Sequence, residues 1–251
     1  FFTATPRVSN KHDRGMNNRE IFGPVIENVP APELIKGGHI LRPTIVPFET
    51  DYTVDKKQPH LVHSTTVQDI IDNLDESHAA KVLVAVPSSR VLGNILGHTD
   101  LLFQLKDRGY DVLHVTSKFG AYVNDQKVNR EKFFETLNAW GKEDDRKFVI
   151  FHYSILSEGI NVAGLTHTIL LRNLNVVEMA QTIGRVIRLD KRDAAGIASG
   201  DLSPCSWSCY HKPTGYVSVP VHSNHGAAVI KRLQRVTDEI FVKGVPATAL
   251  V

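Results

Sequence analysis

Cysteine is scarce in this chain of 251 residues, where Cys205 and Cys209 are the two cysteines and lie within one short segment. Two cysteines cannot build the disulfide framework of a small secreted domain, so a reducing intracellular compartment, cytoplasmic or nuclear, is expected. Long apolar runs are also missing. No stretch approaches the roughly 20 residues of a membrane span, no signal peptide is visible, and no membrane partner is expected.

An excess of one charge is likewise absent, because 29 Lys and Arg residues face 27 Asp and Glu residues, for a net charge of +2. This balance neither indicates nor excludes a nucleic-acid partner, since such a partner requires a local basic track rather than a basic total. The hydrophobic share of 42% allows a substantial core. No internal repeat or low-complexity tract interrupts the sequence.

Short apolar runs alternate with segments of helical periodicity through the middle of the chain. The expected strands are residues 81–87, 111–116, 147–152 and 166–171, and the expected helices are residues 66–76, 90–108, 128–140 and 176–187. This alternation predicts the α/β class, with a parallel sheet that carries helices on both faces. Ligands in such sheets lie at the carboxyl ends of the strands, which are Val86, Val115, His152 and Leu171.

The two flanks differ from this middle part. Residues 1–60 are rich in proline and glycine and hold one strand candidate at 39–49, so they are expected to form a linker. The main domain is expected at 61–191. Residues 192–251 are expected to form a small C-terminal extension, with a loop at 194–204, a strand at 215–222 and a helix at 224–242.

The strongest chemical signal is Gln181-Thr-Ile-Gly184-Arg185-Val-Ile-Arg188. On a helix, the glutamine, the glycine and both arginines would share one face. Gly184 would leave room for a close approach, and two arginines one turn apart could direct their donors toward a polyphosphate. Spacing alone leaves a second interpretation open, in which the arginines pair with Glu178 or Asp190 on an exposed helix.

This segment resembles motif VI of superfamily 2 helicases, Q-x-x-G-R-x-x-R. The chain also holds Thr3-Ala4-Thr5-Pro6, similar to motif III in the TATP form seen in many DNA-acting and restriction-type members. Residues 83–89 (LVAVPSS) resemble motif IV, residues 157–162 (SEGINV) resemble motif V, and residues 129–134 match the helix between those two motifs. The ordered set, which covers residues 1 to about 191, resembles the C-terminal RecA-like domain of a superfamily 2 helicase or translocase.

The resemblance implies a RecA-like fold and an ATP site, with Mg²⁺, in a cleft shared by two such domains. No G-x-x-x-x-G-K-[ST] phosphate loop and no D-E-x-H box occurs in the sequence, although phosphoryl transfer in this class requires both a phosphate cradle and a held metal. Both are expected on an N-terminal RecA-like domain that precedes this chain. Residues 1–60 would then be the linker from that domain, and this chain alone would hydrolyse no ATP.

The resemblance also assigns roles to single residues. Arg185 and Arg188 would act as arginine fingers at the γ-phosphate, and Gln181 would orient them or the attacking water. Three residues, Gly159, Asn161 and Gly184, would lie against the nucleotide, and two, Thr3 and Thr5, would couple ATP binding to movement. Asn161 departs from the usual motif V aspartate; it can still bond a sugar hydroxyl, or it merely turns the loop.

The implied nucleic-acid track, DNA rather than RNA, would cross the loops after the first two strands of the main domain. The candidate contacts are Ser88, Ser89, Arg90, Thr116, Ser117 and Lys118, whose hydroxyls, amides and cations suit phosphates. The two serines could equally be a helix N-cap. No metal site is expected, since the histidines near Cys205 and Cys209 lack the spacing of a second zinc-ligand pair.

Three functions remain open at this stage: a motor on DNA, a motor on RNA, and a non-catalytic RecA-like module that binds nucleic acid. The retained arginines favour a motor, because a degenerate module has little use for them.

Overall fold

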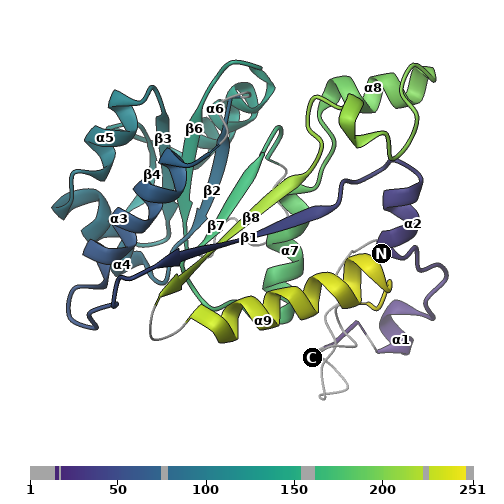
Figure 1. The fold of residues 1–251 in the computed structure, drawn as a ribbon, viewed down its shortest axis with the longest axis horizontal. Coiled ribbons are helices and arrows are strands. Elements are labelled where there is room, and N and C mark those ends of the chain that lie inside the picture. The colour runs from purple at the N-terminus through teal and green to yellow at the C-terminus, as the bar shows by residue number, and fades with distance from the viewer. Residues whose placement is uncertain (1–14, 17, 75–78, 154–161, 223–225, 247–251) are drawn as a thin grey trace.

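The computed structural model describes residues 15–16, 18–74, 79–153, 162–222 and 226–246. Its centre is a sheet that has eight strands within these ranges, in the order β1-β8-β7-β2-β6-β3-β4-β5 (Figure 1). The strands are β1 (Pro43–Thr50), β2 (Lys81–Ala85), β3 (Asp111–Thr116), β4 (Gly120–Val123), β5 (Gln126–Val128), β6 (Phe148–His152), β7 (His167–Leu170) and β8 (Gly215–His222). In this spatial order, all neighbouring strands from β1 through β8, β7, β2 and β6 to β3 are parallel, whereas β4 and β5 add an antiparallel edge.

The four expected strands of the main domain are neighbours in the order β7-β2-β6-β3 and run parallel, which confirms the α/β prediction. Along β2 the side chains alternate between two cores: Leu83 and Ala85 belong to one cluster, Val82 and Val84 to the other. A strand buried on both faces is what a continuous apolar run predicts for a parallel sheet.

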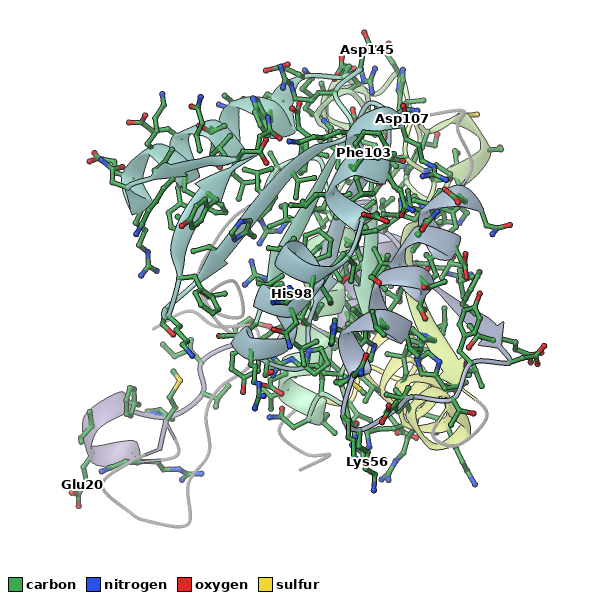
Figure 2. The ribbon with its side chains drawn as sticks, turned by 90° about the vertical axis from the view of Figure 1, so that its left-hand side faces the viewer. Glu20, Lys56, His98, Phe103, Asp107 and Asp145 are labelled. Carbon is green, nitrogen blue, oxygen red and sulfur yellow. The ribbon has the colours of Figure 1, made fainter. Side chains whose placement is uncertain are left out.

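Helices cover both faces of the sheet (Figure 1). On one face lie α3 (Pro59–Asp72), α4 (Ser89–His98) and α5 (Leu101–Asp107). On the other lie α6 (Arg130–Lys142), α7 (Val176–Val186) and α9 (Gly226–Val236), which a π-helical turn (Thr237–Val242) prolongs. The short helices α1 (Arg19–Phe22) and α2 (Ala31–Lys36) precede β1, and Figure 2 shows Glu20 on α1 apart from the sheet.

The flanks contribute to this same sheet. Strand β1, from the segment expected to be a linker, pairs along its whole length with β8, from the segment expected to be an extension. Strand β8 in turn pairs with β7. The division at residues 60 and 191 stays a prediction, but the sheet itself is continuous across both positions.

Two sequence-based expectations about helices are wrong. The single helix at 90–108 is two helices, because Thr99 adopts extended backbone angles and its hydroxyl donates to the Ile95 carbonyl at 2.6 Å. The expected loop at 194–204 begins as helix α8 (Lys191–Ser199), which Asp190 caps at its start and Gly200, at φ 86°, ends.

The β4–β5 hairpin was not expected. Its two-residue turn places Asn124 at φ 52°, and the Asn124 side chain accepts the Val112 amide at 2.8 Å and donates to Asp111 at 2.9 Å. Asparagine tolerates this left-handed conformation, so the turn residues carried a signal for the hairpin.

Candidate nucleotide and nucleic-acid sites

Helix α7 carries most of the Gln181–Arg188 segment and begins with a reciprocal cap. The Asn175 side chain accepts the Glu178 amide at 2.9 Å, and the Glu178 carboxylate accepts the Asn175 amide at 3.2 Å. The same carboxylate lies 3.6 Å from Arg172, which follows β7. The Glu178 carboxylate therefore acts at the start of the helix, both as part of the cap and as the ion-pair partner of Arg172.

Arg185 lies on α7 and is only 6% exposed. Burial, and after it the charge of Arg188, lower the pKa of Arg185 to about 10. The charges of Arg172 and Arg185 also reach His152 at the end of β6, where burial is the main cause of a pKa lowered to about 3. Both ring nitrogens of His152 and Nε of Arg172 lack a hydrogen-bond partner within the described part of the chain. Cationic groups thus converge near the carboxyl end of β6.

Arg188 does not continue the helical face, so that expectation is wrong. Helix α7 ends at Val186, with Ile187 as its cap, and Arg188 forms an antiparallel bridge with Ile40. The Lys212 ammonium donates to the Arg188 carbonyl at 2.7 Å. Arg188 is an exposed residue, yet partial burial of its guanidinium lowers the pKa of that group. Among the described residues it makes no ion pair.

Gly184 faces open space. A Cβ added to it would meet no heavy atom of the described residues within 4 Å, and its backbone has no positive φ. Glycine inside a helix costs about 1 kcal/mol relative to alanine. Neither its backbone conformation nor packing against the described residues requires a glycine at this position. Gln181, one turn earlier, is half-buried.

The remaining nucleotide and coupling candidates, Gly159, Asn161, Thr3 and Thr5, lie outside the described residues. Their roles stay predictions.

The nucleic-acid candidates occupy two neighbouring turns. Ser88 is the N-cap of α4, because its hydroxyl accepts the Val91 amide at 3.1 Å, and Ser89 and Arg90 open the helix. At the end of β3, the Thr116 hydroxyl accepts the Phe119 amide at 2.9 Å. Thr116 is buried, whereas Ser117 and Lys118 are exposed. The structure thus shows the capping role of Ser88, and contact of these residues with nucleic acid stays a prediction.

Phe119 lies in the turn after β3 and packs against α4, so it connects the two turns that hold the candidates. It is not among the site residues expected from the sequence. A Cβ built on Gly93 of α4 would lie 3.1 and 3.2 Å from two ring carbons of Phe119, so the ring lies against this glycine. Phe119 is nevertheless 37% exposed. In the sequence, the signal for a turn that presents this ring is the glycine directly after it, Gly120, which the structure places at φ 86°.

The surroundings of the cysteines bear on the expectation about metal. Within the described ranges no group of three or more His, Cys, Asp or Glu side chains could hold a metal ion. The Cys205 thiol points at the Ile35 carbonyl, with the sulfur 3.4 Å from the oxygen.

Comparison with known proteins identifies the family of this chain. Residues 65–190, half of the chain, match the model of the helicase conserved C-terminal domain. The chain belongs to this family. Its helicase C-terminal domain therefore holds β2, β6, β7 and α7, and Arg185 and Arg188 lie at the end of the matched region. No curated protein matches the sequence.

Two solved structures share the fold. An ATP-dependent Type ISP restriction-modification enzyme, LlaBIII bound to DNA, is 10% identical with a TM-score of 0.57; the match covers 94% of this chain and 17% of that one. A fragment of a putative HsdR subunit of a type I restriction enzyme from Vibrio vulnificus YJ016 is 16% identical with a TM-score of 0.54, over 95% of this chain and 41% of that one. The chain thus spans less than half of the length of either of these proteins. No helix in the described ranges combines the length and apolar character that crossing a membrane demands.

Proposed function

We propose that this chain is the second half of an ATP-driven superfamily 2 motor that acts on DNA. The observation that carries the proposal is the arrangement around α7: the buried Arg185, the nearby Arg188 guanidinium with no ion pair among the described residues, and the open space at Gly184. Two adjacent cations and an uncrowded glycine suit a polyphosphate that arrives from outside this part of the chain.

ATP and Mg²⁺ would be held mainly by an N-terminal RecA-like domain. The residues of this chain fit the γ-phosphate side of such a site, because Arg185 is fixed by burial and Arg188 is free to reach outward. Both would stabilise the charge that develops on the transferring phosphoryl group, and Gln181 would orient them or the attacking water. DNA is proposed as the track because both structural neighbours are restriction enzymes, one of them bound to DNA, and because the TATP segment resembles DNA-acting members.

The test is Arg188→Ala in the full-length protein. ATP turnover should fall by about 10³-fold or more, whereas ATP binding should weaken far less, because a guanidinium at the γ-phosphate acts mainly on the transition state. Arg188→Lys should not restore turnover, since lysine lacks the planar fork of donors. The measurements are steady-state ATPase activity and direct nucleotide binding.

The matched control is Arg192→Ala. Arg192 lies four residues on and already pairs with Asp190 at 2.9 Å and with Asp144 at 3.5 Å, so turnover should be retained. Intact turnover in Arg188→Ala together with lost turnover in Arg192→Ala would contradict the assignment of the motif. A protein that binds nucleic acid but hydrolyses no ATP would instead be the non-catalytic module, and stimulation by RNA alone would indicate an RNA track.

A further inference from the structure

Phe119 is an exposed aromatic ring with a defined seat. It lies against Gly93 of α4, where a Cβ in place of the glycine hydrogen would lie 3.1 and 3.2 Å from two ring carbons and would force the ring to shift by a few tenths of an ångström. Its amide is tied to the Thr116 hydroxyl at 2.9 Å, which fixes the start of the turn, and Gly120 at φ 86° fixes its end. A ring held in this way loses little conformational entropy when a flat partner binds it.

Two cationic residues, Lys118 and Arg90, lie on the turn that holds Phe119 and on the helix that it packs against. The Lys118 ammonium lies 5.4 Å from the centroid of the Phe119 ring. Arg90 is on the same face of α4 as Gly93, one turn earlier, and it too is exposed. Among the described residues, neither Lys118 nor Arg90 makes an ion pair, so both charges are available to an anionic partner.

We infer that Phe119 is a stacking platform for an unpaired base of a nucleic-acid strand, whose phosphates Lys118 and Arg90 neutralise. An exposed aromatic ring with one cation over it and a second exposed cation on the adjoining helix, neither in an ion pair among the described residues, matches the chemistry of single-strand binding. In such binding the ring takes a base face and the cations follow the backbone. A paired duplex keeps its base faces stacked and presents phosphates, which would use the cations but not the ring. The inference rests on the proposed function and specifies its track at this site as single-stranded.

The test compares strand binding by the wild-type chain and by Phe119→Ala, with fluorescence anisotropy on a labelled oligothymidylate. Loss of one stacked base should weaken binding by about tenfold. Phe119→Trp should retain the affinity, and Gly93→Val, which fills the seat while leaving the phenylalanine in place, should weaken it as Phe119→Ala does. Lys118→Ala should instead lower the dependence of log K on log salt by about one unit.

Two controls separate stacking from general surface effects. Phe103 on α5 is a second exposed ring, 72% accessible and on another element than Phe119, so Phe103→Ala should leave the affinity unchanged (Figure 2). An oligonucleotide of equal length with abasic sites keeps the phosphates but offers no base, so the wild-type chain and Phe119→Ala should bind it equally.

The outcomes are distinct. Equal binding of oligothymidylate by the wild-type chain and Phe119→Ala overturns this inference and leaves the motor proposal standing. Equal loss on the abasic strand would overturn stacking as well. Failure of the full-length protein to bind any nucleic acid would overturn the proposed function and this inference together.

Discussion

At the scale of single residues, the proposed function makes a specific claim about a glycine that packing within the described residues does not require. This glycine is Gly184. It is a helical glycine with open space around its Cα, whereas Gly215 would place a Cβ 2.3 Å from the Val186 carbonyl oxygen and is required by packing. Packing within the described residues therefore requires glycine at position 215, whereas it does not require glycine at position 184.

Substitution of Gly184 by alanine should separate stability from activity. The free energy of unfolding should rise by about 1 kcal/mol, because alanine loses less backbone entropy in a helix. The ATPase activity of the full-length protein should fall, because the added methyl group enters the space that the nucleotide would use.

Gly97→Ala is the matched control for this substitution. Gly97 is also helical, in α4, and a Cβ on it would also meet nothing within 4 Å among the described residues. This variant should gain similar stability with unchanged ATPase activity. Urea unfolding and steady-state ATPase assays measure both quantities, and a fall in stability for Gly184→Ala would show that the space is not open.

At the scale of elements, the segment after α7 is held from two sides. The Leu41 amide donates to the Ile187 carbonyl at 2.7 Å, and the Lys212 ammonium donates to the Arg188 carbonyl at 2.7 Å. Asp193 of α8 is fully buried and accepts the Lys212 amide at 3.0 Å and the His211 amide at 2.8 Å. Helix α8 and the loop before β8 thereby fix the backbone from which Arg188 projects.

Lys212 should make the free energy of unfolding of the chain depend on pH. Burial lowers the pKa of Lys212 to about 7 in the folded chain, against about 10.4 in an unfolded one. Between these values the unfolded state binds more protons, so the free energy of unfolding should rise with pH, by up to about 1.4 kcal/mol per pH unit. Urea unfolding at pH 7, 8 and 9 should show this slope, and Lys212→Met should flatten it.

Lys243→Met provides the control for the pH experiment. Lys243 is exposed, and its hydrogen bond to Glu239 raises its pKa, so it keeps its proton throughout this range. The wild-type slope should therefore persist in this variant. A slope that survived Lys212→Met unchanged would show that the buried ammonium is not its source.

At the scale of the whole molecule, one sheet joins the matched region to both flanks. The family model ends at residue 190, yet β8 lies between β7 and β1, and α9 packs against β8. The folding unit is thus larger than the region that matches the family. Truncation at 190 would remove the partner of β7 on that side of the sheet.

The 251-residue chain by itself should hydrolyse no ATP, with or without DNA. Its sequence holds neither a phosphate loop nor an acidic box to hold the metal, and phosphoryl transfer in this class depends on both. A phosphate-release assay on the purified chain, with the full-length protein as the positive control, measures this. Robust turnover by the chain alone would overturn the proposal that its ATP site is shared.

The sequence by itself determined the four inner strands, the family, and the helices of the main domain apart from the break at Thr99. Each of these depends on local periodicity or on a short motif, as in residues 81–87 or Gln181–Arg188, and such signals are complete within a few consecutive residues. The caps of α8 and the turn at Asn124 were also present locally, as Asp190, Gly200 and Asn124 itself, although they were not interpreted correctly.

Only the tertiary structure decided which distant segments meet. Three such contacts join residues that are at least 24 positions apart: the pairing of β8 with β7, the hydrogen bond from Lys212 to the Arg188 carbonyl, and the packing of Phe119 against Gly93. The free energy of such contacts depends on burial and hydrogen bonding that arise when the sheet assembles, and the spacing of residues along the chain does not encode it. For this reason the motif identified the arginines, and the fold decided where Arg188 lies.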